Sequence, residues 1–181
     1  MNRNHLLLAA VGLASMLAGV ALFHVMQSNE PVASAEPPPS IELHSIPLSK
    51  LDGQQSVLSD WNNRILVINF WAPWCAPCRR EIPALIEIQR EYAARDLLIL
   101  GLAFDFEPSV REFAAEYDIN YPLFLVEGRS SMYNAAFSNP SGSLPYTAIL
   151  GPERNIRFQH NGELSADQLR EQIERQFQSP G

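Results

Sequence analysis

Apolar and polar positions along the chain follow the periods of strands and helices. Residues 65–71 and 97–104 are apolar runs with few interruptions, which is typical of strands buried on both faces of a sheet. Residues 75–94 and 108–117 carry apolar side chains at helical spacing, and a shorter apolar run covers residues 121–126. Strands that alternate with helices predict an α/β fold with a largely parallel central sheet covered on both faces.

Turn signals predict two hairpins outside this alternating region. Asp52-Gly53 between short apolar runs predicts one hairpin over residues 46–58, and residues 151–154 form the turn of the other. The second hairpin is expected to add antiparallel strands at one side of the sheet. A last helix is predicted after Ser165, because Ser165 and Gln168 have the spacing of a capping box.

The first 40 residues differ in composition from the rest. Residues 6–26 contain no Asp, Glu, Lys or Arg, and 21 residues are enough to cross a bilayer as a helix. Arg3 precedes this segment, which predicts a cytoplasmic N-terminus and a globular domain on the other side of the membrane. The predicted parts are a cytoplasmic end (1–5), a membrane anchor (6–26), a proline-rich linker (27–40) and the globular domain (41–181).

A cleaved signal peptide is the alternative interpretation of the N-terminal segment. Residues 33–35, Ala-Ser-Ala, resemble a cleavage site. The apolar run is longer than the usual core of a signal peptide, and the Ala-Ser-Ala lies well past its end, which favours the anchor. Both interpretations place the domain outside the cytoplasmic membrane.

The charge of the chain restricts its partners. The formal net charge is −7 at pH 7, whereas non-specific binding of nucleic acid requires a basic surface. No nucleic-acid partner is therefore expected.

The chemistry is indicated by the only two cysteines, Cys75 and Cys78, which directly follow the apolar run 65–71. A Cys-x-x-Cys pair where a strand passes into a helix is typical of a redox site. The helix start favours negative charge, so Cys75 is biased toward the thiolate form. An inert disulfide and half of a zinc site are the alternatives; for zinc, none of the four histidines has the usual spacing.

Three segments resemble a known family. Residues 69–83, from Asn69 through the cysteine pair to Pro83, resemble the active-site segment of the thioredoxin superfamily, and more narrowly that of the membrane-anchored TlpA/ResA-like thiol–disulfide oxidoreductases. Residues 142–147 resemble the family's loop with a cis-proline, and residues 48–58 its N-terminal hairpin. The resemblance implies a thioredoxin fold: a central mixed sheet with helices on both faces, an N-terminal β-hairpin and a central helix–strand insertion over residues 105–126.

The resemblance also implies catalytic roles. Cys75, at the exposed tip of the helix, is expected to attack a substrate disulfide, and Cys78 to resolve the mixed disulfide. Asn69 stands where thioredoxins proper carry a buried proton-accepting aspartate. Glu81, one helical turn after Cys78, is the candidate replacement, with a pKa that a partly apolar pocket would raise toward neutrality. The alternative is a solvated Glu81 in the first turns of a helix, where acids are favoured in any case.

Substrate contact is predicted at the residues around the pair. A cis Leu144–Pro145 bond is expected to place the Leu144 backbone beside Cys75, where it could pair with an extended substrate peptide. Trp74 is expected at the rim of the site and Trp71 in the core. The predicted substrate-binding residues are Trp74, Ala76, Pro77, Leu144 and Pro145.

These features predict an extracytoplasmic thiol–disulfide oxidoreductase that reduces protein disulfides and needs no cofactor or metal beyond the Cys75–Cys78 pair. The family implies a single-pass protein of the bacterial inner membrane with its catalytic domain in the periplasm. It also implies a membrane thiol donor of the DsbD/CcdA kind, and substrates such as apocytochromes c. The cytochrome-maturation branch, however, carries Gly-Val-Tyr-Gly-x-Pro-Glu at the cis-proline loop, where this chain has Ser-Gly-Ser-Leu-Pro-Tyr.

Three alternative functions are weighed beside reduction. A disulfide oxidase or isomerase would use the same fold in the other direction. A thiol peroxidase is disfavoured because Ala72 stands where those enzymes carry the threonine of Thr-x-x-Cys. A copper metallochaperone is disfavoured because those relatives space their cysteines one residue further apart.

Overall fold

In the computed structural model of this protein, residues 19, 20, 23 and 42–178 are described. The chain divides into two units, residues 1–39 and 40–181. In the first unit, Gly19, Val20 and Phe23 are helical and exposed. The rest of the predicted anchor, the cytoplasmic residues 1–5 and the linker 27–40 lie outside the described residues. No helix within the described part of the chain is long and apolar enough to cross a membrane.

The second unit is built on one mixed sheet whose strands run in the order β2-β1-β5-β4-β3-β6-β7. Strand β3 is buried at every position, because helices cover both of its faces and strands flank both of its edges. The apolar runs in the sequence predicted β3 and β4 to within one residue. The strands are β1 (Pro47–Lys50), β2 (Gln55–Val57), β3 (Ile65–Trp71), β4 (Leu97–Ala103), β5 (Leu123–Leu125), β6 (Tyr146–Leu150) and β7 (Ile156–Asn161).

The prediction of a largely parallel sheet is wrong. Only the pairings of β3 with β4 and of β4 with β5 are parallel. The closing hairpin β6–β7 is antiparallel to β3, as expected, but the N-terminal hairpin β1–β2 also joins the sheet, where β1 is antiparallel to β5. The alternation of strands and helices identifies the parallel centre, but it does not reveal which edge a hairpin joins.

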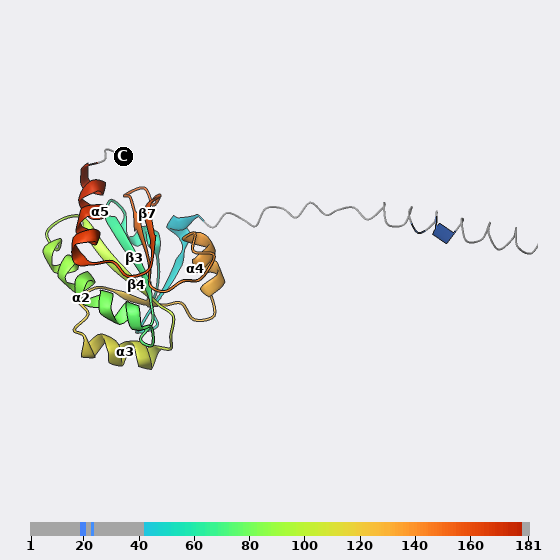
Figure 1. Ribbon diagram of the computed structural model, residues 1–181, viewed down its shortest axis with the longest axis horizontal. Coiled ribbons are helices and arrows are strands. Elements are labelled where there is room, and N and C mark those ends of the chain that lie inside the picture. The colour runs from blue at the N-terminus through green and yellow to red at the C-terminus, as the bar shows by residue number, and fades with distance from the viewer. Residues whose placement is uncertain (1–18, 21–22, 24–41, 179–181) are drawn as a thin grey trace, which may run out of the picture. The chain divides into compact units, whose positions relative to one another are not determined.

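Helices cover both faces of the sheet, as predicted (Figure 1). Apolar side chains of α2, α3 and α5 pack on one face, and those of α4 pack on the other, together with the short 3₁₀ turns η1 and η2. The Ser165 and Gln168 side chains cap α5 reciprocally, which confirms the predicted capping box. The helices are α2 (Ala76–Glu91), α3 (Glu107–Glu116), α4 (Ser130–Ala136) and α5 (Ala166–Gln178), and the turns are η1 (Leu43–Ser45) and η2 (Leu58–Trp61).

The candidate site lies at the carboxyl ends of the central strands, where their connections begin. The chain leaves β4 toward α3 on one face and leaves β5 toward α4 on the opposite face. Connections that diverge in this way open a crevice at the carboxyl edge of an α/β sheet. Strand β3 ends at the same edge, and the cysteine pair follows it directly.

Candidate active site

The two cysteines lie at the N-terminal end of α2 and are joined by a disulfide, with their Cα atoms 5.3 Å apart. Cys75 is the N-cap residue of α2, and its Sγ accepts a hydrogen bond from the backbone N–H of Cys78 at 3.3 Å. Pro77 lies in the first turn, where a missing N–H leaves no helical bond unmade. A thiolate on Cys75 would receive the same hydrogen bond and the favourable field of the helix start.

The expectation that Cys75 is exposed is not met in this oxidised state. Cys75 is only 5% exposed, and Cys78 only 1%. The disulfide holds Sγ of Cys75 back over the first turn of α2, and both cysteines belong to the apolar cluster under that helix. Cys75 is slightly less buried than Cys78, and its role as the attacking cysteine stays a prediction.

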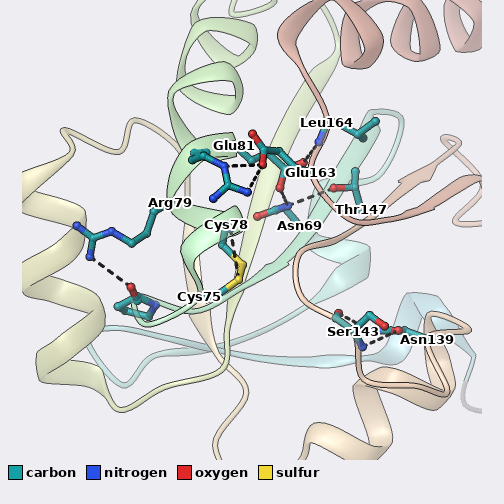
Figure 2. The surroundings of a disulfide bond; sticks show 12 residues. Asn69, Cys75, Cys78, Arg79, Glu81, Asn139, Ser143, Thr147, Glu163 and Leu164 are labelled. Carbon is teal, nitrogen blue, oxygen red and sulfur yellow. Dashed lines mark hydrogen bonds and ion pairs between the residues drawn. A yellow bond between two sulfur atoms is a disulfide. The ribbon is translucent and has the colours of Figure 1, made fainter.

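Glu81 is buried in the same apolar layer, and it is not a solvated residue. Its Oε1 accepts a hydrogen bond from the backbone N–H of Leu164, and its Oε2 accepts one from Nδ2 of Asn69, both at 3.0 Å (Figure 2). Burial raises the pKa of Glu81 to about 7; the two hydrogen bonds oppose this shift, and the nearby charge of Glu163 adds to it. The predicted shift toward neutrality is therefore confirmed.

Asn69 of β3 connects Glu81 to the neighbouring strand β6 through hydrogen bonds. Its side chain is fully buried, and Nδ2 donates a second hydrogen bond to Oγ1 of Thr147 at 3.2 Å. Thr147 lies directly opposite Asn69 in the pairing of β3 with β6. The Asn69 amide is thus a hydrogen-bond donor to the acid that α2 carries.

Three residues of this network, Thr147, Glu163 and Leu164, were not predicted from the sequence. Arg80 pairs with Glu163 at 2.7 Å, so the carboxylate whose charge raises the pKa of Glu81 is itself paired with a cation. Thr147 follows Pro145 by two residues, and a correct register of β3 against β6 would have identified it. No local signal marks Glu163 or Leu164.

The predicted substrate-binding residues lie in the loop before β6 and around the start of α2. The Leu144–Pro145 bond is cis, as predicted, and Leu144 is half-buried between the two apolar clusters. Trp74 is 68% exposed, as expected for a rim residue. Ala76 and Pro77 lie in the first turn of α2.

Trp74 also lines an open groove of about 590 Å³ at the crevice between the β4–α3 and β5–α4 connections. Its apolar wall includes Phe106, which is 75% exposed. None of the other predicted substrate-binding residues lines this groove, and Phe106 was not singled out in the sequence. The lining residues are Trp74, Phe104, Asp105, Phe106, Val126, Glu127, Gly128 and Ser130.

The structure describes no cluster of three or more His, Cys, Asp or Glu side chains among residues 19, 20, 23 and 42–178 that could hold a metal ion.

A mixed sheet with a Cys-x-x-Cys disulfide at the start of α2 and a cis-proline before β6 defines a thioredoxin-like protein. A family model described as the AhpC/TSA family matches residues 36–159. The chain is 33% identical over 132 residues to the thioredoxin-like protein YneN of Bacillus subtilis, covering 70% of this chain and 74% of YneN.

More distant relatives agree with this classification. The thiol-disulfide oxidoreductase ResA of Bacillus cereus is 26% identical over 123 residues, covering 67% of this chain and 69% of ResA. The crystal structure of StoA from Bacillus subtilis has the same fold, with a TM-score of 0.59 at 16% identity over 71% of this chain and 95% of StoA. The chain therefore belongs to the AhpC/TSA family and is a thioredoxin-like thiol–disulfide oxidoreductase.

Proposed function

We propose that this protein reduces disulfides of other proteins outside the cytoplasmic membrane, by exchange at Cys75 and Cys78. The observation that carries the proposal is the pairing of a helix-capping cysteine disulfide with a buried carboxyl group, Glu81, whose pKa is about 7. A group that titrates near neutrality can both accept and return a proton at physiological pH.

The reaction begins with the reduced pair. The thiolate of Cys75 attacks one sulfur of the substrate disulfide, the substrate S–S bond breaks, and the other substrate sulfur leaves as a thiolate. Cys78 then loses its proton and attacks Sγ of Cys75. The mixed disulfide breaks, the second substrate sulfur leaves, and two electrons have passed from the dithiol to the substrate. The product is the Cys75–Cys78 disulfide that the structure contains.

Glu81 is the proposed acceptor for the proton of Cys78. The two residues lie three positions apart on α2, which places them on the same side of the helix. Both are buried, so a proton from Cys78 has no direct route to bulk water. Transfer of that proton to Glu81 also neutralises the carboxylate, so the new thiolate does not face a second negative charge in an apolar site.

The substrate polypeptide is proposed to bind beside Trp74. The groove that Trp74 lines is large enough for a bulky side chain and presents the exposed rings of Trp74 and Phe106. Asp105 and Glu127 border it, so a segment with an apolar residue and a neighbouring cation would fit best. Leu144 and Pro145 are proposed to contact the segment that carries the target cysteine.

The N-terminal segment and the resemblance to membrane-anchored relatives support a proposal about location and redox partners. Residues 6–26 are proposed to anchor the chain in the bacterial inner membrane, with the catalytic domain in the periplasm. Because that compartment is oxidising, the dithiol needs electrons from across the membrane, for which we propose a thiol donor of the DsbD/CcdA kind. Disulfides of apocytochromes c are among the proposed substrates.

The direction of exchange is tested by the redox potential. Equilibration of Cys75–Cys78 with glutathione or dithiothreitol should give a value close to that of thioredoxin, about −270 mV, and reduced protein should reduce the disulfides of insulin. A value close to that of DsbA, about −120 mV, would instead identify an oxidase.

Removal of the proposed base tests the role of Glu81. Glu81→Gln should slow the resolving step about 100-fold at pH 7, at the lower end of general-base effects. In the wild type this rate should rise with pH through an inflection near 7, because protonated Glu81 cannot accept a proton. The variant should lack that inflection in stopped-flow decay of a mixed disulfide.

Glu163→Gln is the matched comparison for that experiment. It keeps Glu81 but removes the neighbouring charge that raises its pKa, so the inflection should move to lower pH. A Glu81→Gln profile that matches the wild type would remove Glu81 from the mechanism.

Trp74→Ala tests whether the groove binds the substrate polypeptide. Loss of the exposed ring should lower kcat/KM for a protein disulfide about tenfold, as for a moderate interface contact. The rate with a small disulfide such as oxidised glutathione should hardly change, and Phe106→Ala should behave in the same way. Equal losses with both kinds of substrate would mean that Trp74 acts on the cysteines and does not bind the polypeptide.

The proposed location is tested by labelling in intact cells. A membrane-impermeant thiol reagent, applied after mild reduction, should modify the cysteine pair without lysis. Modification that requires lysis would place the domain in the cytoplasm.

A further inference from the structure

The loop between α4 and β6, residues 137–145, contains a fully buried asparagine, Asn139, to which the exchange reaction assigns no role. The backbone makes a turn over residues 139–142, in which the C=O of Asn139 accepts a hydrogen bond from the N–H of Gly142 at 2.9 Å. Gly142 has a φ of 62°, in the left-handed region that favours glycine. The turn reverses the chain, so the residue after it, Ser143, returns to the Asn139 side chain.

The side chain of Asn139 uses its full hydrogen-bonding capacity. Nδ2 donates to the C=O of Ser143 at 3.1 Å and to Oδ1 of Asn134 at 3.2 Å. Oδ1 accepts from the backbone N–H of Ser143 at 3.1 Å and from Oγ of Ser141 at 3.3 Å. An amide side chain has two donor hydrogens and two acceptor lone pairs, and all four are occupied here.

Two of these hydrogen bonds hold both backbone groups of one residue, Ser143 (Figure 2). A side-chain amide carries the same N–H and C=O groups as a peptide unit, so Asn139 pairs with Ser143 as a residue of a neighbouring strand would. Because Asn139 is buried and fully paired, it fixes the backbone of Ser143 and, with it, the start of the next residue, Leu144.

Leu144 is the residue whose backbone this arrangement leaves unpaired. Within the described part of the chain, its N–H and C=O make no hydrogen bond. The groups on either side of it are occupied, those of Ser143 by Asn139 and the C=O of Pro145 by the N–H of Gly162 at 2.9 Å. An N–H and a C=O on one residue are the two groups that a residue of an antiparallel strand exchanges with its partner.

The register of the sheet places Leu144 at the edge where the cysteines lie. Tyr146 lies opposite Phe70 in the antiparallel pairing of β6 with β3. Leu144 precedes Tyr146 by two residues, so it lies at the carboxyl end of β3, from which the chain continues to Cys75. Its side chain packs against the apolar cluster that contains both cysteines.

We propose that Asn139 is a positioning residue for the substrate: it holds the Ser143 backbone so that the N–H and C=O of Leu144 pair with an extended segment of the polypeptide that carries the target disulfide. This contact has the form of a short added strand, and it depends on the backbone of the substrate and not on its side chains. The contact therefore favours an extended polypeptide over a small disulfide, whatever the sequence of the polypeptide. The inference rests on the proposed function, because it assigns a contact to the same exchange reaction.

A role of Asn139 in stability alone would have different consequences. The hydrogen bonds of its side chain stay within its own loop and α4, so its loss leaves the hydrogen bonds of Cys75 and of Glu81 unchanged. If Asn139 only stabilised the loop, its replacement would lower the unfolding temperature without distinguishing between substrates. A positioning role affects only those substrates whose backbone pairs with Leu144.

Asn139→Ala tests the proposal with two substrates. With a short peptide disulfide, kcat/KM should fall about tenfold, as for the loss of one or two ordinary hydrogen bonds. The rate with bis(2-hydroxyethyl) disulfide, which has no peptide backbone, should not change, and neither should the reduction potential of the cysteine pair.

Ser141→Ala is the matched control for that experiment. Ser141 is exposed, and its hydroxyl bonds to the same Oδ1 of Asn139, but its loss leaves both hydrogen bonds between Asn139 and Ser143 in place. This variant should keep the wild-type kcat/KM with the peptide disulfide.

Methylation of the peptide backbone supplies a measurement that a purely structural role would not change. An N-methyl group on one amide of the peptide removes one N–H donor and keeps every side chain. Among peptides methylated at one amide each near the target cysteine, at least one should react about tenfold more slowly with the wild type. The same methyl group should have little effect with Asn139→Ala, because the pairing with Leu144 is already lost.

The methylation series decides the proposal even where Asn139→Ala does not fold, since it uses the wild-type protein. A wild-type rate that no single N-methyl group lowers overturns the proposal, and so do equal losses by Asn139→Ala with the peptide and the small disulfide. If the reduced protein reduces no peptide disulfide, the proposed function falls. The series is then measured with oxidised protein and the dithiol peptides, because the same segment lies beside Leu144 in either direction of exchange.

Discussion

The burial of one carboxyl group is the constraint on which this site depends. Glu81 is held by hydrogen bonds from β3 and from the segment before α5, so its position joins three parts of the fold. A shift of its pKa from 4.5 to about 7 corresponds to roughly 3 kcal/mol of destabilisation of the native state when Glu81 is ionised. This loss is absent below pH 4.5 and grows as the pH rises toward 7, because over that range the native state holds a proton that the unfolded chain releases. The apolar packing of α2, α3 and α5 supplies the stability that offsets it.

The order of the strands determines which residues lie beside Asn69 on β3. Its position in the centre of the sheet gives it Thr147 as a neighbour on β6 and Gly101 as a neighbour on β4. Thr147 accepts a hydrogen bond from the Asn69 amide, and Gly101 carries no side chain. A Cβ at Gly101 would lie only 2.6 Å from Cδ2 of Leu123, so the close packing beside Asn69 requires a glycine there. Both neighbours lie opposite Asn69 because β3 is flanked by β4 on one edge and by β6 on the other.

Local patterns in the sequence were sufficient to predict the strands β3 and β4, helix α2 and the redox character of the cysteine pair. Each of these features depends on periodicity or spacing within about 20 residues. Glu81 was found because it lies on the same helix as Cys78. The contacts that give Glu81 its chemistry could not be found in this way: Thr147 lies 78 residues from Asn69, and Leu164 lies 83 residues from Glu81. The groove at Trp74 was missed for the same reason, since it forms where two connections diverge and its second aromatic, Phe106, follows a different strand. The pairing of β1 with β5 could not be predicted from a local pattern either.

Position 69 carries a neutral amide, so the ionisable group of this network is Glu81 on α2. An aspartate at position 69 would be an acid in its own right, whatever its orientation. The amide instead donates through one nitrogen to both Glu81 and Thr147. A hydrogen bond to the carboxylate lowers the pKa of Glu81, whereas burial raises it by more, so the acid is kept near neutrality by two opposing effects that come from different parts of the fold.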